Sequence, residues 1–510
     1  MKKKSLCIFS LLSIFSLVNC GGNSGVVTHV VDQPLPEDDP TSPVEILFWH
    51  CLGQAKRNEF QVNVVDPFNV MYSGKYHVTL EAIAGSYDDL ADGLITYMQS
   101  GTVPALTMGY PDFFSTLMTD YENRSAILRL DSWIDDPDFG LEDKSDFIEA
   151  YYKEGTNYQH EGTWSVPLYK STEVLYYNES FFMGVNKLNV AKFGGDSTFN
   201  ELYDAAADLT DKDNLDANLL ALKTWLEKPE NNGYTWEVPN SWQDMFALAR
   251  EIKTLMAQQF PSDLFTPIVY DSDSNMMITQ LAQRGFGYTT NENIRSPHDH
   301  YIFNNANTIG LVEEITGYIN EGLLTTKGVS GDYGSKPFAA GTCIMTVGST
   351  GGSTYSDEDT VGFSVGIAPV PCWKNGEGVV QRKYIQQGPS ICFFDNQNPY
   401  MNKGAWLFYK YLSGTEQNVR VAVNNSYDPV RTSCYSTTFY ENEMAKANQH
   451  YSLRYDIPYV TKDLKAFYMT SPVFKGSENA RDQIGAIIQN VRSRSMTPAD
   501  AVARAWRACI

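Results

Sequence analysis

The stretch WSVPLYKSTEVLYYNESFF, residues 164–182, sets three polar residues directly before an apolar run. The run VLYYN combines β-branched and aromatic residues, which is typical of a buried strand. Pro167 restricts the backbone of the residue before it, and Lys170, Ser171 and Thr172 then lead into the run. Taken locally, this pattern fits a surface loop before an edge strand. Whether the chain instead passes here between two folded units depends on the sequence around it.

The residues nearer the N-terminus predict an α/β fold. Apolar runs of strand length occur at VEILFWHC (44–51), YHVTLEAIAG (76–85) and VPALTMGY (103–110). Between the last two, residues 86–101 place apolar side chains at helical spacing. Strands that alternate with helices form parallel β-α-β units, and ligands bind beyond the carboxyl ends of their strands. His50, Tyr87 and residues 110–112 follow such ends and are therefore candidate binding residues.

The first residues of the chain predict export. MKKKS is followed by about a dozen apolar residues, a combination typical of a secretory signal and too short for a stable membrane span. Cys20 comes after residues 17–19, which resemble a bacterial lipoprotein processing box. The next residues are rich in Gly, Pro, Asp and Ser, as in a flexible linker. We predict a signal peptide over residues 1–19 and a lipid-anchored linker over residues 20–43, which place the protein outside the cytoplasm on a bacterial membrane.

Composition excludes several functions. The 510 residues include 61 acidic against 39 basic residues, with a formal charge of −22. Without a basic cluster after the signal, this charge excludes a nucleic-acid surface. The eight cysteines show no CxxC spacing, which argues against zinc and redox sites but leaves disulfides open among the six after Cys20. We expect neither a metal nor a cofactor.

Two short motifs suggest chemistry that their surroundings do not support. GFSVG, residues 362–366, matches the nucleophile pattern GxSxG. That pattern needs a helix directly after the serine, whereas here VGIAPVP follows with two prolines, so we predict no catalysis by Ser364. HDH, residues 298–300, lies in a polar stretch and is expected to be a solvated loop rather than a metal site.

Seven motifs follow one another along the chain: FWH, VPLYKSTEVLYYN, SWQDMFALA, PFAAGTCIMTVGSTGG, VGIAPVP, WLFYKYLSGTEQ and YDPVR. In this order they resemble the extracellular solute-binding proteins of ABC importers, in the carbohydrate-binding group that includes maltose-binding protein. The resemblance implies a two-lobed α/β fold in which each lobe has a mixed, mainly parallel sheet flanked by helices. It places residues 164–182 at a hinge crossing between the lobes, with the polar residues 170–172 facing the cleft.

The resemblance also implies the domain organisation. The first lobe is expected over residues 44–166 and 380–425, and the second over residues 167–379 and 426–510. Residues 205–239 depart from the shorter family members and are expected to form an insertion. The two lobes are expected to close around the ligand by hinge bending.

The same resemblance implies which residues bind the ligand. They are His50, Gln54, Tyr87, Tyr110, Asp112, Ser171, Thr172, Ser349, Thr350, Gly351, Gln387, Gly388 and Arg431. Aromatic rings suit the apolar faces of sugars, whereas amides, hydroxyls and carboxylates form paired hydrogen bonds with sugar hydroxyls. The set therefore predicts a carbohydrate ligand, either a sugar or an oligosaccharide. The resemblance implies a non-catalytic monomer that delivers this ligand to the permease subunits of an ABC transporter.

Three alternatives stay open. A receptor for glycerol 3-phosphate or another phosphorylated polyol would use Arg431 to bind phosphate, although the implied set contains no second arginine. A surface glycoside hydrolase would need two carboxylates about 5–10 Å apart, and Asp112 is the only firm carboxylate in that set. A purely structural or adhesive lipoprotein would need no ligand.

Cys20 yields a first prediction. We expect the mature protein to begin at a diacylated Cys20 and to partition into the detergent phase during detergent phase separation. N-terminal sequencing of the native protein should then find a blocked residue. Partition into the aqueous phase, together with a mature N-terminus other than a blocked Cys20, would contradict the anchor.

Overall fold

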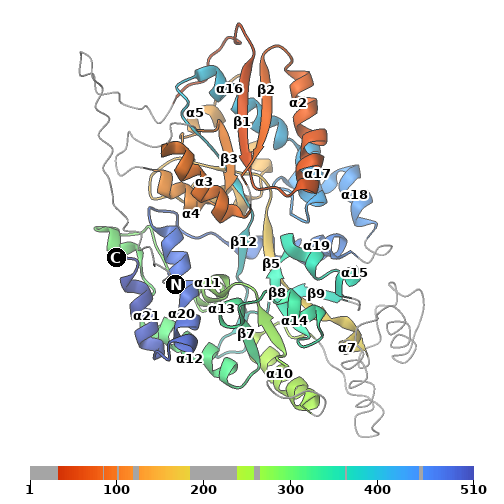
Figure 1. The fold of residues 1–510 in the computed structure, drawn as a ribbon, viewed down its shortest axis with the longest axis vertical. Coiled ribbons are helices and arrows are strands. Elements are labelled where there is room, and N and C mark those ends of the chain that lie inside the picture. Colours follow the sequence, from red (N-terminus) through yellow and green to blue (C-terminus); the bar gives the residue numbers. More distant parts are fainter. Residues whose placement is uncertain are drawn as a thin grey trace, which may run out of the picture.

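The computed structural model describes residues 33–83, 85–99, 103–118, 126–183, 238–257, 265–361, 365–446 and 452–510. Within them, two main sheets belong to separate lobes, which lie one above the other in Figure 1. Helices flank each sheet, so the two-lobed α/β fold predicted from the sequence is confirmed. Cys20, Ser364 and nearly all of the predicted insertion lie outside the described residues.

The sheet of the first lobe has the strand order β2-β1-β3-β13-β4. Its strands are β1 (Val44–His50), β2 (Tyr76–Ala82), β3 (Leu106–Gly109), β4 (Val166–Pro167) and β13 (Ser390–Phe393). β1 pairs in parallel with β2 and β3, and β13 is antiparallel to β3. The helices of this lobe are α1 (Gln54–Phe60), α2 (Asp66–Met71), α3 (Tyr87–Gln99), α4 (Pro111–Phe114), α5 (Asp131–Ile134), α6 (Glu149–Glu154), α16 (Pro399–Leu412), α17 (Thr415–Asn424) and α18 (Thr438–Met444).

The main sheet of the second lobe has the order β14-β12-β5-β8-β6-β7, and β9 also pairs with β5. Its strands are β5 (Ser171–Asn178), β6 (Ile268–Tyr270), β7 (Leu324–Thr326), β8 (Met345–Ser349), β9 (Val365–Pro369), β12 (Tyr384–Gln387) and β14 (Tyr468–Met469), while β10 (Trp373–Lys374) and β11 (Val380–Gln381) form a separate hairpin. The helices are α7 (Glu179–Met183), α10 (Trp242–Met256), α11 (Asp273–Gln283), α12 (Ala306–Asn320), α13 (Lys327–Ser330), α14 (Ser335–Ala339), α15 (Glu358–Val361), α19 (Leu453–Thr461), α20 (Ser477–Ser493) and α21 (Pro498–Arg507).

The strand that contains VLYYN is an interior strand, so the alternative of an edge strand is wrong. β5 pairs with β8, β9 and β12, all antiparallel. Every residue of β5 except Tyr177 is buried. Within β5, residues 174–177 show no polar alternation, as expected for a strand that is covered on both faces.

The crossings between the lobes differ in position from those expected. β12 pairs with β5 through Gln386 and Gln387, so residues 384–387 belong to the second sheet, although they were expected within the first-lobe segment 380–425. The chain also stays with the first lobe beyond residue 425. There α18 packs on α17 through a cluster that includes Val423 and Tyr440.

Lys170, directly before β5, and Ser171 and Thr172, the first two residues of β5, are buried in the hinge, and the expectation that they face the cleft is wrong. The Lys170 side chain has no exposed surface and pairs with Glu154. Its Nζ also donates to Gly388 O at 3.0 Å and to Ser390 Oγ at 3.1 Å. Thr172 is fully buried and donates from Oγ1 to Ile385 O at 2.6 Å. The hinge therefore encloses these polar groups, and Lys170 and Thr172 bond to the returning crossing segment.

The end of the predicted linker is bound to the first lobe. The buried Lys403 of α16 donates to Asp38 O at 2.9 Å and to Glu37 O at 3.3 Å. The Trp133 indole N–H donates to Gln33 O, and Leu35 is buried in the core. The linker predicted over residues 20–43 is thus too long at its C-terminal end, because residues 33–39 contact the folded lobe.

The cysteines of the described residues are all free thiols. The six cysteines that the structure describes, Cys51, Cys343, Cys372, Cys392, Cys434 and Cys509, form no disulfide.

Across the described part of the chain, no helix is long and apolar enough to span a membrane.

The buried Lys170 gives a second prediction. Replacing Lys170 by Met leaves Glu154 without its cation in the hinge, so the free energy of unfolding should fall by about 3–5 kcal/mol in urea denaturation. Lys336→Met is the matched control, since Lys336 pairs with Asp332 at the exposed surface and should change stability by less than about 1 kcal/mol. Equal effects of the two substitutions would show that the hinge does not depend on the buried cation.

Candidate functional site

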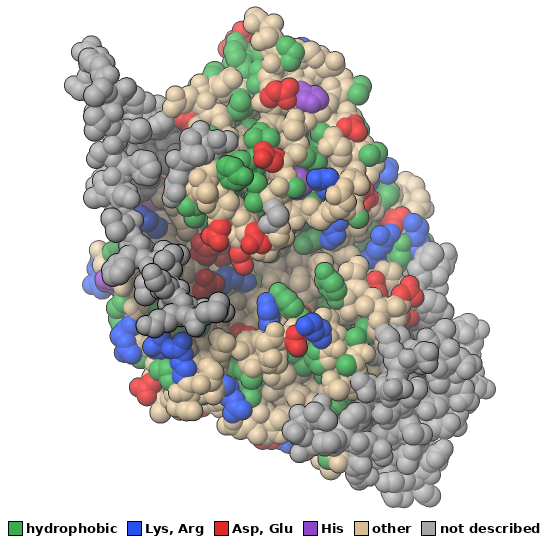
Figure 2. All heavy atoms as spheres, viewed as in Figure 1, with side chains coloured by type: hydrophobic (Ala, Val, Ile, Leu, Met, Phe, Trp, Pro, Cys, Tyr) green, Lys and Arg blue, Asp and Glu red, His purple; other side chains and the backbone are tan. Residues whose placement is uncertain are grey.

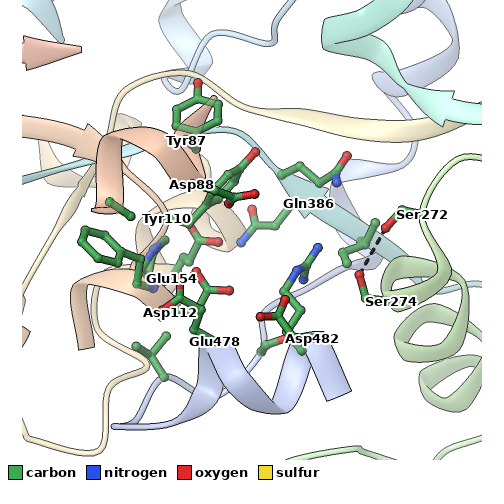
Figure 3. Close-up of a pocket in the computed structure, with 18 of the residues that line it drawn as sticks. Tyr87, Asp88, Tyr110, Asp112, Glu154, Ser272, Ser274, Gln386, Glu478 and Asp482 are labelled. Carbon is green, nitrogen blue, oxygen red and sulfur yellow. Dashed lines mark hydrogen bonds between the residues drawn. The ribbon is translucent and has the colours of Figure 1, made fainter. Parts of the chain in front are cut away.

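A cavity of about 780 Å³ lies between the two lobes and is lined by residues of both. Figure 3 shows side chains from α3, α4, α6, α11, α20 and the hinge strand β12 around it. Its first wall lies beyond the carboxyl ends of β2 and β3, where ligands bind in open α/β sheets.

The first-lobe wall is built from the start of α3 and the loop into α4. Ser86 precedes α3, and its N–H donates to Asp89 Oδ2 at 2.7 Å while Asp89 N donates to Ser86 Oγ at 3.2 Å. This reciprocal pair starts the helix and so positions Tyr87 and Asp88 at the cavity. The Tyr87 and Tyr110 rings meet edge to face with centroids 4.8 Å apart, which gives the wall an aromatic surface.

The floor of the cavity is the strand β12. Gln386 is 6% exposed, and its Nε2 donates to Ala150 O at 2.9 Å. The buried Oε1 atoms of Gln386 and Gln387 have no hydrogen-bond donor among the described residues. Since a buried acceptor without a donor is costly, these two oxygens are suited to accept hydrogen bonds from a ligand.

The second-lobe wall contains α20 and the residues that hold it in place. Arg481 of α20 donates to Asn275 Oδ1, and Asn275 Nδ2 donates to Glu173 Oε1 at 2.7 Å. Tyr270 OH donates to the other oxygen of Glu173 at 2.6 Å. Burial raises the pKa of Glu173 to about 7. This chain of bonds fixes the Arg481 guanidinium beside the cavity.

Carboxylates from both lobes face one another across the cavity. Burial raises the pKa of Glu478 to about 7, helped by the negative charges of Asp112, Asp482, Asp88 and Asp92. Burial also raises the pKa of Asp482, and the negative charges of Asp88 and Asp112 raise it further. Figure 3 places Asp112 and Glu478 close together, and Figure 2 shows acidic side chains gathered at the hollow between the lobes. The cavity therefore carries a negative potential.

Comparison with known proteins identifies the family. A family model described as bacterial extracellular solute-binding protein matches residues 63–448. The chain belongs to this family. Its members are the substrate-binding components of transporters, not enzymes, and they act outside the cytoplasm, so this solute-binding protein is extracytoplasmic.

Individual relatives are distant. The sn-glycerol-3-phosphate-binding periplasmic proteins UgpB of Brucella abortus and Rhizobium meliloti are each 24% identical to this solute-binding protein, covering 78% of both chains. Among solved structures, UgpB from Mycobacterium tuberculosis in complex with glycerophosphocholine has a TM-score of 0.64 at 14% identity, covering 91% of this chain and 97% of its own. The GacH receptor of Streptomyces glaucescens, solved with acarbose, has a TM-score of 0.62 at 16% identity, covering 92% and 98%. These two likenesses show the fold.

The structure brings four of the predicted binding residues to the cavity of this solute-binding protein: Tyr87, Tyr110, Asp112 and Gln387. The other nine do not line it: His50, Gln54, Ser171, Thr172, Ser349, Thr350, Gly351, Gly388 and Arg431. Gln386, which the sequence places with Gln387 on the same returning hinge segment YIQQGPS, also lines the cavity. Sequence reasoning missed the α20 residues Glu478, Arg481 and Asp482.

Most of the excluded residues have structural partners. His50 is fully buried, and its Nδ1 accepts from Leu52 N at 3.1 Å. Thr350 Oγ1 accepts from Thr172 N at 3.3 Å inside the hinge. A Cβ at Gly351 would lie 2.8 Å from the Tyr427 ring, so this glycine allows close packing. Gly388 has φ +95°, a conformation that other residues rarely adopt.

Arg431 supports the first lobe. Its Nε donates to Ser413 O at 2.6 Å, which satisfies a carbonyl group at the end of α16. Its Nη1 lies 3.5 Å from Asp146 Oδ2, and its guanidinium is 4.0 Å from the centre of the Phe147 ring. A phosphate in the interlobe cavity would therefore not contact Arg431.

The pKa of Glu478 gives a third prediction. Because this pKa rises from its usual 4.5 to about 7 on folding, the folded protein loses stability as the pH increases from about 4.5 through 7. Glu478→Gln removes this loss, so its melting temperature should fall less between pH 5 and pH 8 than that of the wild type. Glu377→Gln, at the exposed hairpin turn, serves as the control and should follow the wild type. A wild-type pH dependence in Glu478→Gln would contradict the raised pKa.

Proposed function

We propose that this solute-binding protein captures a carbohydrate in its interlobe cavity and delivers it to the permease subunits of an ABC importer. The observation that carries the proposal is the composition of the floor and first wall. Two amide oxygens, those of Gln386 and Gln387, have no donor within the part of the chain that the structure describes, and they lie in the same cavity as the Tyr87 and Tyr110 rings. Sugar hydroxyls donate to such oxygens, and apolar sugar faces pack on such rings.

A phosphorylated polyol is the second candidate, because the UgpB relatives are named for sn-glycerol 3-phosphate. The charges of this cavity favour a ligand without phosphate. Arg431 lies outside the cavity, and the lining cations Arg481 and Lys327 face a larger number of carboxylates. Phosphate sites instead concentrate cationic donors.

The cavity carboxylates would bind hydroxyls and carry out no hydrolysis. The protein would act as a monomer that is anchored through Cys20 and closes by bending at the hinge around Lys170. Closure would remove water from the ligand and complete its hydrogen bonds, which strengthens each of them.

The fourth prediction tests the floor of the cavity. A glycan panel that also contains glycerol 3-phosphate should first be screened by thermal shift and then titrated by calorimetry. Gln387→Ala should weaken binding of the best glycan by about 1–3 kcal/mol, or roughly five- to 150-fold, because a buried ligand hydroxyl loses its acceptor. Gln381→Ala, on the separate hairpin, is the control and should bind like the wild type.

The outcomes separate the candidates. Wild-type affinity in Gln387→Ala would remove the proposed floor. Tight binding of glycerol 3-phosphate without any glycan would establish the second candidate, and glycan cleavage during the screen would establish a hydrolase.

A further inference from the structure

The cavity carries more negative charge than its own cations balance. Among the described residues that line it, Glu154 is already paired with Lys170 in the hinge. Five further carboxylates line the cavity: Asp88, Asp92, Asp112, Glu478 and Asp482. Within the described chain, two lining cations oppose them, Arg481 and Lys327, and both have other contacts. Arg481 donates to Asn275, and Lys327 Nζ lies 3.8 Å from the centre of the Tyr333 ring.

A second observation independently points to a ligand with hydrogen-bond donors. Gln386 is 94% buried, since its exposed fraction is 6%, and its Oε1 has no donor among the described residues although it lies at the cavity. The adjacent Gln387 is only partly buried, but its Oε1 atom is buried and likewise has no donor among the described residues. The cavity thus offers acceptors and negative charge together, which is the environment that suits a group with N–H donors and a positive charge.

A metal ion does not account for this charge. No three His, Cys, Asp or Glu side chains of the described residues converge in a way that could hold a metal. The carboxylates stand on α3, α4 and α20, in both lobes, and surround a cavity of about 780 Å³. A ligand of several ångströms, instead of a single ion, is needed to reach them.

We propose that the ligand is a carbohydrate that bears a protonated amine, with the ammonium group facing Asp88, Asp112 and the α20 carboxylates. This inference rests on the proposed function, because it specifies the class of carbohydrate bound in the same cavity. The sugar ring packs beside Tyr87 and Tyr110, and the ammonium group donates toward the carboxylates and the floor amides. Aromatic faces next to the site add to the attraction for a cation.

The two acidic walls belong to different lobes. Asp88, Asp92 and Asp112 stand on the first lobe, whereas Glu478 and Asp482 stand on the second. Their mutual repulsion contributes to the raised pKa of Glu478 and of Asp482. A cation between the walls converts this repulsion into attraction toward both lobes, whereas a neutral ligand leaves it in place.

Matched ligands test the inference. Sugars and short oligomers on gluco and galacto frames can each be compared as the amine, the N-acetyl derivative and the plain hydroxyl compound, by calorimetry at pH 6.5 and low salt. Within each set that binds, the amine should bind about tenfold more tightly than its N-acetyl partner. This difference should shrink in 0.5 M NaCl, because salt screens partly exposed charges.

Substitutions locate the charge that is responsible. Asp482→Asn should reduce affinity for the amine by about fivefold and change affinity for the N-acetyl partner by less than twofold. Asp138→Asn, at an exposed position outside the cavity, should leave both affinities unchanged. A merely structural effect of Asp482→Asn would weaken both ligands alike and would overturn the role assigned to this carboxylate.

Three further outcomes separate a failure of the amine inference from a failure of the proposed function. Neutral glycans that bind as tightly as their amines would overturn the inference and keep the proposed function. Tight binding of spermidine without any sugar would show that the amine alone is recognised, and would overturn both. Binding of no amine and no glycan would also reject both.

Discussion

The buried ammonium group of Lys170 joins the segments on which the rest of the structure depends. It lies between β4 and β5, pairs with Glu154 of α6, and donates to Gly388 and Ser390 on the returning crossing. The Lys170 backbone also bonds Asp428 in both directions, at 3.0 Å and 2.5 Å. A charge removed from water must be fully paired. Its partners therefore fix where each crossing passes, and the two sheets take their relative positions from these crossings.

Much of the fold follows from local patterns in the sequence. The runs around Ile46, Val78 and Met108 lie in β1, β2 and β3, because short stretches rich in apolar and β-branched residues favour strands. The rule that ligands bind beyond the carboxyl ends of such strands correctly brought Tyr87 and Asp112 to the cavity. The same rule also selected His50, which does not line the cavity. Its ring is buried and accepts a hydrogen bond from Leu52 N, two residues further along the chain.

The second-lobe wall of the cavity, formed by α20, could not be predicted from the sequence, because its acidic residues have ordinary explanations on a helix. Glu478 stands in the first turn of α20, where the helix dipole favours a carboxylate without any ligand. Asp482 follows it one turn later, as expected on a solvated helix face. Only the folded chain shows that this face meets α3 and α4, more than 350 residues earlier in the sequence. The prediction that Lys170 faces the cleft was wrong for a similar reason. A charged residue before a strand is expected to be exposed, and the sequence does not show the partners that allow Lys170 to be buried.

The contact between residues 33–39 and α16 determines how force reaches the protein. Lys403 and Trp133 hold this segment on the first lobe, so a pull on the N-terminus acts on that lobe and bypasses the hinge. If Cys20 is attached to a membrane, the stretch from Cys20 to Gln33 extends at most about 45 Å. The first lobe would then be the part held near the membrane. The second lobe would move about the hinge without changing how far residues 20–33 are extended.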